Sequence, residues 1–142
     1  MPLQSGRSNR EGREPRTILL VEDEPFVREA TCSILQRAGY RVLSAEDAPQ
    51  ALEAWEQHGG NVELLMADTV LPGKSGDELG EELRKRSAVL PVLLTSGYGG
   101  VEEREAPETR TYFLAKPYSR RSLIDKIEAI LGVAKVRAAQ AG

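Results

Sequence analysis

The sequence predicts an α/β domain in which a parallel sheet is covered by helices on both faces. Five apolar runs of strand length alternate with segments whose apolar residues recur at helical spacing. The connections between them are short, and the first run is continuously aliphatic or β-branched, as in a strand buried on both faces. Such alternation favours parallel pairing through right-handed crossovers, which places the sheet between two helical layers.

The first strand is expected at residues 17–21, and the helix after it at 26–38. Pro25 suits the first turn of that helix, Phe26 begins its apolar pattern, and Gly39 ends it. The acidic residues just before the proline are expected either to cap the helix or to lie near its positive end.

A second strand is expected at residues 40–44 and a second helix at 48–58, with Trp55 on its apolar face. The third strand covers 62–68 and ends in a carboxylate. Leu-Pro-Gly and a further glycine then force the chain to turn before a third helix at about 76–86.

The fourth strand is expected at residues 91–96 and the fifth at 112–115. Between them, several glycines and Pro107 leave room only for a short or irregular fourth helix near 101–105. This connection is shorter and richer in glycine than a full fourth helix requires, which argues against dimerisation through that helix.

The final helix, capped by Ser119, is expected to end near Leu131, so the domain spans residues 17–131. Residues 1–16 are polar, contain four arginines and are predicted to be a disordered N-terminal tail. Residues 132–142 form a C-terminal tail that either extends the helix or frays.

Length and charge narrow the class of protein. The 142 residues are enough for one domain with its own core. The formal net charge of −3 is small and gives no reason to expect direct binding to nucleic acid. No apolar stretch is long enough to span a membrane, and no secretion signal is present, so we expect a cytoplasmic protein.

Cys32 lies in an apolar helical pattern and is expected to be a buried or half-buried thiol.

Four of the five predicted strands end in polar side chains that suit metal or phosphate chemistry. These side chains are Glu22 and Asp23, then Asp68, then Thr95 and Ser96, then Lys116. Because the carboxyl ends of parallel strands meet at one edge of a sheet, residues far apart in sequence are expected to share one cleft. The remaining strand, which ends near Glu46 and Asp47, is placed at the margin of the sheet.

Carboxylates that converge in this way repel one another unless a cation lies between them. Carboxylate oxygens, the backbone carbonyl of Val70 and water suit Mg²⁺, whereas the lack of nearby cysteine and histidine argues against zinc. Lys116 can reach a phosphoryl oxygen, and Ser96 can donate a hydrogen bond to the same group. Carboxylate, metal, ammonium and hydroxyl together are the groups that phosphoryl transfer requires.

Each of these residues also has a purely structural interpretation. Glu22 and Asp23 suit a helix N-terminus, and the Ser96 hydroxyl suits a bond to the backbone at a strand end. His58 follows a helix and precedes two glycines, so an exposed helix-end histidine is favoured over a phosphodonor.

Taken together and in this order, the motifs resemble the receiver domain of two-component response regulators, over about residues 17–131. The resemblance rests on the acidic pair at 22–23, the run at 68–73 with Gly76, the Thr-Ser-Gly at 95–97, and Lys116-Pro117. The short connection after the fourth strand is similar to that of receivers attached to hybrid sensor kinases. The resemblance implies a flavodoxin-like fold with strand order 2-1-3-4-5.

The resemblance also implies a role for each site residue. Asp68 is the expected phosphoacceptor, taking a phosphoryl group from a histidine kinase or histidine phosphotransfer protein. Mg²⁺ is expected to bind Asp23, Asp68 and the Val70 carbonyl directly, and Glu22 through water.

Three further residues, Ser96, Lys116 and Thr69, are expected to hold the phosphoryl group or move toward it. Phe113 occupies the position of an aromatic ring that reports the switch, with Tyr112 beside it.

By the same resemblance, the protein is a phosphorylatable switch and not a turnover enzyme. Phosphorylation shifts an equilibrium between two states and changes the affinity for a downstream protein partner. A monomer or weak homodimer that binds neither nucleic acid nor membrane directly is expected.

Two alternative functions are open. A metal-dependent phosphatase with an aspartyl nucleophile, of the haloacid dehalogenase type, needs a second aspartate two residues after the first, where this chain has Val70. A receiver-like binding module that is never phosphorylated would lack an acidic or lysine position, and none is missing here.

Overall fold

The computed structural model describes residues 15–97 and 105–141, without the side chains of 133–141. The five strands are β2 (Thr17–Val21), β3 (Arg41–Ala45), β4 (Leu64–Asp68), β5 (Val92–Ser96) and β6 (Thr111–Ala115). The helices are α2 (Pro25–Arg37), α3 (Ala48–Gln57), α4 (Gly76–Arg84) and α5 (Arg120–Ala141), with a 3₁₀ turn η2 (Pro107–Thr109).

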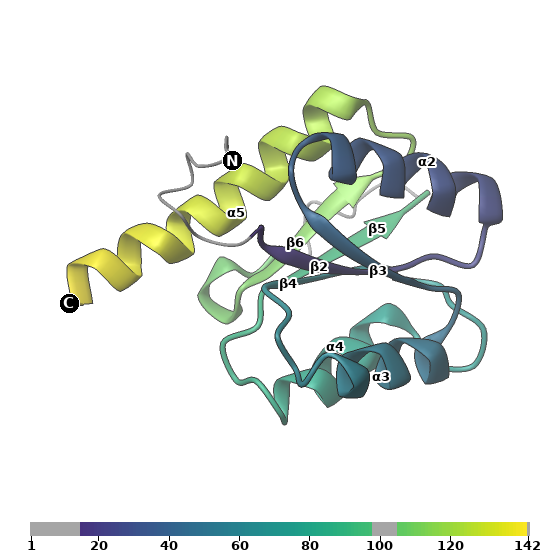
Figure 1. The fold of residues 1–142 in the computed structure, drawn as a ribbon, viewed down its shortest axis with the longest axis horizontal. Helices are drawn as coiled ribbons and strands as arrows, with labels where there is room; N and C mark the ends of the chain where they lie inside the picture. The colour runs from purple at the N-terminus through teal and green to yellow at the C-terminus, as the bar shows by residue number, and fades with distance from the viewer. Residues whose placement is uncertain (1–14, 98–104, 142) are drawn as a thin grey trace, which may run out of the picture.

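The strands form one parallel sheet in the order β3-β2-β4-β5-β6. Numbered along the chain, this is the order 2-1-3-4-5, so the predicted flavodoxin-like topology is confirmed. The helices α2 and α5 cover one face of the sheet, and α3 and α4 cover the other (Figure 1).

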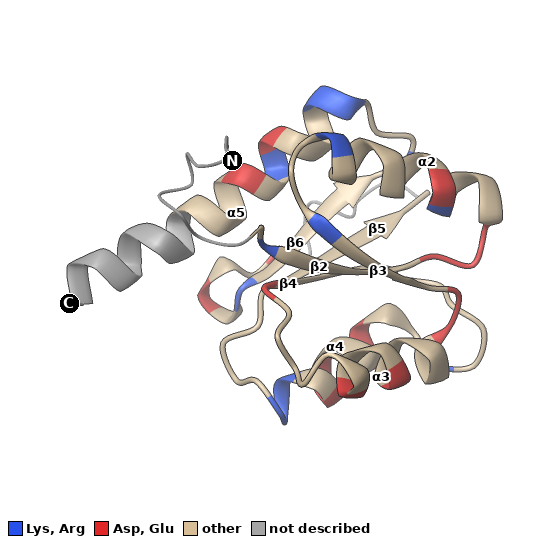
Figure 2. Cartoon of the chain, viewed as in Figure 1, with Lys and Arg blue, Asp and Glu red and all other residues tan. Residues whose placement is uncertain are grey.

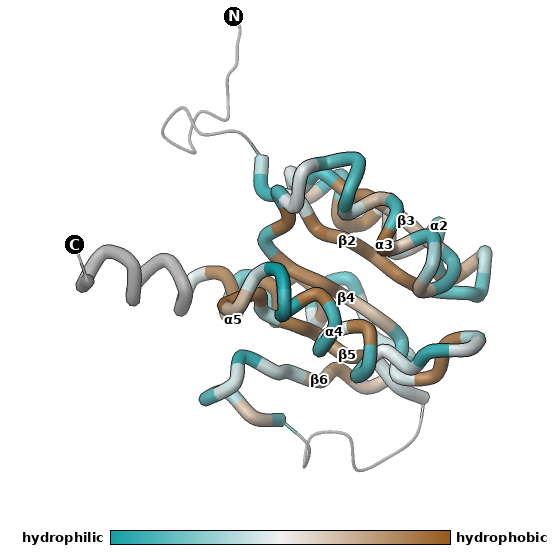
Figure 3. The backbone as a smooth tube through the Cα atoms, turned by 90° about the horizontal axis from the view of Figure 1, so that it is seen from below, coloured by the Kyte–Doolittle hydropathy of each residue, from teal (hydrophilic) through white to brown (hydrophobic). Residues whose placement is uncertain are grey.

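Two hydrophobic cores lie on opposite faces of the sheet, because successive side chains of a strand point in opposite directions. In β2, Leu19 and Val21 belong to the core under α3 and α4, whereas Ile18 and Leu20 belong to the core under α2 and α5. In Figure 3 the tube is hydrophobic along most of the central strands β2 and β4, whereas the helices alternate between hydrophobic and hydrophilic residues. This explains why the strands read as continuous apolar runs.

The helix ends follow the local sequence. The Asp47 side chain caps α3 by accepting from the Gln50 N–H at 2.9 Å, and Ser75 and Glu78 form a reciprocal capping box on α4. Gly39 adopts φ 101° after α2. By contrast, α2 begins after Glu24 without a side-chain cap, so the acidic residues before it do not serve as a cap.

Several details differ from the expectations. The Phe26 side chain is 84% exposed, because the face of α2 that packs on the sheet is the one carrying Thr31 and Leu35. The second strand is Arg41–Ala45, one residue later than predicted, and the third begins only at Leu64.

At the C-terminus, α5 continues to Ala141, through the segment predicted as a helical extension or a frayed tail. Most of the fourth helix predicted near 101–105, and most of the N-terminal tail, lie outside the described residues. Just after the undescribed segment, Ala106 pairs with Thr111 at the sheet edge. In the part of the chain that the structure describes, no helix is both long enough and apolar enough to cross a membrane.

Candidate functional site

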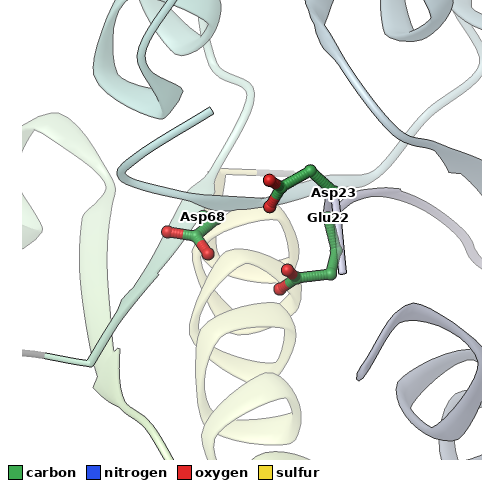
Figure 4. Close-up of side chains that lie close together, drawn as sticks. All are labelled: Glu22, Asp23 and Asp68. Carbon is green, nitrogen blue, oxygen red and sulfur yellow. The ribbon is translucent and has the colours of Figure 1, made fainter. Parts of the chain in front are cut away.

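An acidic cluster lies at the carboxyl edge of the sheet, between the ends of β2 and β4. Glu22, Asp23 and Asp68 each offer a carboxylate oxygen, and the three oxygens lie within 4.8 Å of one another. Figure 4 shows the three side chains extending from two separate segments into the same space. The strand order reverses between β2 and β4, which is where open α/β sheets bind their ligands.

The second acidic connection, between β3 and α3, lies at the same edge (Figure 2) but serves another purpose. Asp47 caps α3, and Glu46 accepts a hydrogen bond from the Gln50 side chain. As the sequence suggested, this strand lies at the margin of the sheet.

Lys116, one residue past the end of β6, reaches into the acidic cluster. Its Nζ donates to Glu22 Oε1 at 2.8 Å and to Asp68 Oδ2 at 2.7 Å. Burial by itself would lower the pKa of Lys116, but the hydrogen bonds to Asp68 and Glu22 outweigh it and raise the pKa. The ammonium therefore remains charged and offsets the repulsion between the two carboxylates.

Asp68 is fixed by the tight turn that follows it. Its Oδ1 accepts the Val70 N–H at 2.9 Å, so both carboxylate oxygens have a partner. The turn closes because the Gly76 N–H donates to the Thr69 carbonyl, and a Cβ at Gly76 would lie 2.3 Å from the Asp68 carbonyl oxygen. A glycine at the start of α4 is therefore required by the close approach of the helix to this strand end.

Glu22 is buried, with 2% of its surface exposed. Its Oε2 accepts the Glu24 N–H at 3.1 Å, and its carbonyl oxygen accepts from Arg28 Nη1 at 2.7 Å. Asp23 is exposed, and in the described part of the chain it makes no hydrogen bond or ion pair. The carboxylates of Glu22 and Asp68 are therefore held by hydrogen bonds, whereas the carboxylate of Asp23 is exposed and accessible.

The hydroxyl residues predicted for the site lie at the same edge. Thr95 is the partner of Asp68 in the sheet, and the Thr69 N–H donates to its carbonyl at 2.9 Å. Ser96 pairs with Ala115, and its carbonyl accepts the Lys116 N–H at 2.7 Å. Ser96 and Thr69 are both buried.

Phe113, the predicted switch aromatic, is buried in the core under α3 and α4, next to Leu94 in the adjacent strand. Tyr112 lies against the opposite core. As expected, the Cys32 thiol is half-buried and His58 is exposed at a helix end.

Two polar contacts next to the cluster were missed by sequence reasoning. One is the bond from Arg28 to the Glu22 carbonyl, and the other joins Thr31 of α2 to Tyr118, two residues after Lys116. A threonine facing the sheet four residues before Leu35 was the available signal, because that face of α2 otherwise carries apolar side chains.

The chain is similar to known signalling proteins. A model of the response regulator receiver domain matches residues 18–128. The sensor kinase CckA of Brucella abortus is 37% identical over 117 residues, which cover 81% of this chain and 12% of CckA. The phosphate regulon transcriptional regulatory protein PhoB of Escherichia coli is 32% identical over 124 residues, which cover 82% of this chain and 52% of PhoB.

Among solved structures, the receiver domain of the hybrid histidine kinase CckA matches with a TM-score of 0.70 and 33% identity, covering 81% of this chain and 98% of that domain. The chain therefore spans an almost complete solved domain, but about half or less of the length of these curated relatives.

Proposed function

The chain belongs to the response regulator receiver domain family, whose members accept phosphoryl groups in two-component signalling, and we propose that Asp68 is its phosphoacceptor. The observation that carries this proposal is the contact between Asp68 and Lys116 inside the cluster of three carboxylates. A carboxylate nucleophile beside a fixed cation is the arrangement that phosphoryl transfer needs.

The residues of the cluster fit a magnesium ion. All three side chains offer hard oxygen ligands, and Asp23 is exposed and without another partner in the described part of the chain. We propose that Asp23, Asp68 and the Val70 carbonyl bind Mg²⁺ directly, and that Glu22 binds it through water. The ion would supply positive charge to the phosphoryl oxygens during transfer.

In the proposed reaction, an Asp68 carboxylate oxygen attacks phosphorus, forming an O–P bond while the N–P bond of a phosphohistidine donor breaks. The imidazole leaves with the electron pair of that bond. Lys116 already bonds Asp68 Oδ2 and can follow the new charge onto a phosphoryl oxygen. Ser96 and Thr69, buried at the same edge, are proposed to hydrogen-bond the phosphoryl group.

The donor is proposed to be a histidine kinase or a histidine phosphotransfer protein. Two exposed apolar side chains support a protein donor, Phe26 three residues after Asp23 and Val70 two residues after Asp68. The product is a covalently modified switch that changes its binding to a downstream protein, so we propose a signalling role without catalytic turnover. We further propose that the protein acts in the cytoplasm, where ATP-derived phosphodonors are made, as a monomer or weak homodimer.

Incubation with acetyl phosphate and MgCl₂, followed by intact mass measurement, tests the proposal. The wild-type protein is expected to gain the mass of one phosphoryl group, and Asp68→Asn is expected to gain none. Asp125→Asn, which removes an exposed carboxylate on α5, is the matched control and should be modified like the wild type. Modification of Asp68→Asn would reject the assignment, and steady release of phosphate from simple phosphate esters would favour the phosphatase alternative.

A further inference from the structure

A partly buried hydrogen bond joins α2 to the segment that carries Lys116. Thr31 Oγ1 and Tyr118 Oη are 2.8 Å apart, although the residues are separated by 87 positions in the chain. The Thr31 side chain is 2% exposed, and the Tyr118 ring packs against the core under α2 and α5. Burial raises the pKa of Tyr118, so its phenol stays protonated and available for the bond.

The same helix holds the other side of the cluster. Arg28 and Thr31 are three residues apart and therefore lie on one face of α2. Arg28 Nη1 donates to the Glu22 carbonyl at 2.7 Å, which fixes the end of β2. Thr31 contacts Tyr118, which fixes the segment after β6.

These contacts form a closed ring around the acidic cluster. From α2 it passes through Arg28 to Glu22, through the Glu22 carboxylate to Lys116, along the chain to Tyr118, and back to α2 through Thr31. The ring links the backbone of the lysine to the backbone of a carboxylate through one rigid helix. Apart from the covalent stretch from Lys116 to Tyr118, each link is a directional polar contact, so the ring constrains position more strongly than apolar packing does.

We infer that Tyr118 and Thr31 are positioning residues for phosphoryl transfer. They hold the backbone at Lys116 in place, so that the ammonium at the end of its side chain meets Asp68. A lysine stem has large rotational freedom, and contacts within hydrogen-bond distance require that the backbone beneath the stem be fixed. A phenylalanine at position 118 would pack in the same core but would leave that backbone without its polar tether. The inference rests on the proposed function of Asp68 and Lys116.

Variants that remove one or both hydroxyl groups test this role. Tyr118→Phe and Thr31→Val each delete one of the two hydroxyl groups and leave the other without its partner. The double variant deletes both groups, so no unpaired hydroxyl remains. Tyr40→Phe is the matched control, because Tyr40 is buried in the same core but precedes β3, at the opposite edge of the sheet. Thermal unfolding of each variant shows that it is folded at the assay temperature.

The first measurement is the rate of phosphorylation by acetyl phosphate at saturating Mg²⁺. Tyr118→Phe and Thr31→Val are expected to slow it by about threefold to tenfold, the double variant is expected to match the single variants, and Tyr40→Phe is expected to have no effect. In a Lys116→Ala background, Tyr118→Phe is expected to have no further effect, because it acts through the lysine. Equal effects in both backgrounds, or wild-type rates in both single variants, would overturn the inference.

The second measurement is independent of phosphorylation. The rate at which an acylating reagent labels the Lys116 amine, measured by peptide mass spectrometry in metal-free buffer, reports how well the ammonium is held in the cluster. It is expected to rise about threefold or more in Tyr118→Phe and Thr31→Val and to stay unchanged in Tyr40→Phe. If the wild type accepted no phosphoryl group, the proposed function would fail while this labelling experiment still decided the role of the tether, with unchanged labelling refuting it.

Discussion

Replacement of Lys116 by methionine isolates the ion pairs at the centre of the cluster. The ammonium lies 2.8 Å from Glu22 and 2.7 Å from Asp68, and the Glu22 side chain is only 3% exposed. Methionine retains much of the stem but removes the charge, so Glu22 loses its cation while remaining buried. Removal of one partner from a buried ion pair costs about 3–5 kcal/mol, and because Lys116 is itself 19% exposed we expect the lower end, about 3 kcal/mol.

A more exposed ion pair of equal length provides the control. Lys74 lies 2.8 Å from Glu82, but the two side chains are 39% and 30% exposed. Solvent screens such a pair, so Lys74→Met is expected to lower the free energy of unfolding much less than Lys116→Met does. The two substitutions are chemically identical and differ in the burial of the partner that is left behind.

Urea unfolding of the wild type and both variants in metal-free buffer measures the two losses. We expect the midpoint of Lys116→Met to fall well below that of Lys74→Met, with the slope against urea unchanged, since the surface exposed on unfolding is the same. Equal losses in the two variants would refute the reasoning, because burial of Glu22 would then carry no energetic consequence.

Three further predictions follow from single contacts. Gly76→Ala should destabilise the fold by more than about 2 kcal/mol and slow phosphorylation, because its Cβ would lie 2.3 Å from a backbone oxygen. Gly132→Ala is the control: a Cβ there meets open space on α5, so this variant should raise the unfolding midpoint slightly. Burial by itself would raise the pKa of Glu105, but the Lys126 ammonium and the Phe113 N–H lower it below its ordinary value. The advantage of wild type over Glu105→Gln, about 1 kcal/mol, should therefore be present at pH 7 and be lost as denaturation is repeated at pH values falling through the lowered pKa of Glu105. Asp23→Asn should weaken Mg²⁺ binding, measured by calorimetry, without lowering stability in metal-free buffer; unchanged Mg²⁺ affinity would contradict the proposed ligand set.

The sequence was sufficient to predict the sheet and the edge at which the site lies. Strands such as Leu64–Asp68 are buried on both faces and therefore leave an uninterrupted apolar run, and short connections force parallel neighbours. Once the strands are parallel, Asp68 and Lys116 must emerge at one edge, 48 residues apart in the chain. The convergence of the carboxylates was predicted for this reason.

Contacts that depend on helix rotation could not be predicted in the same way. Phe26 fits an apolar helical pattern, yet it is exposed, since the angle at which α2 meets the sheet decides which face is covered. The bond between Thr31 and Tyr118 depends on that angle and on the path of the chain after β6, and neither leaves a periodic signal. The start of the third strand was predicted two residues too early for a different reason. Val62 is buried like a strand residue, but it precedes β4 and does not belong to it.

Identification of the phosphorylated atom tests the central claim most directly. After incubation with acetyl phosphate and Mg²⁺, borohydride reduces an aspartyl phosphate to homoserine, which peptide mass spectrometry can locate. We predict homoserine at position 68, with Glu22 and Asp23 unmodified. Reduction at either of those residues, or at no residue of the cluster, would contradict the account.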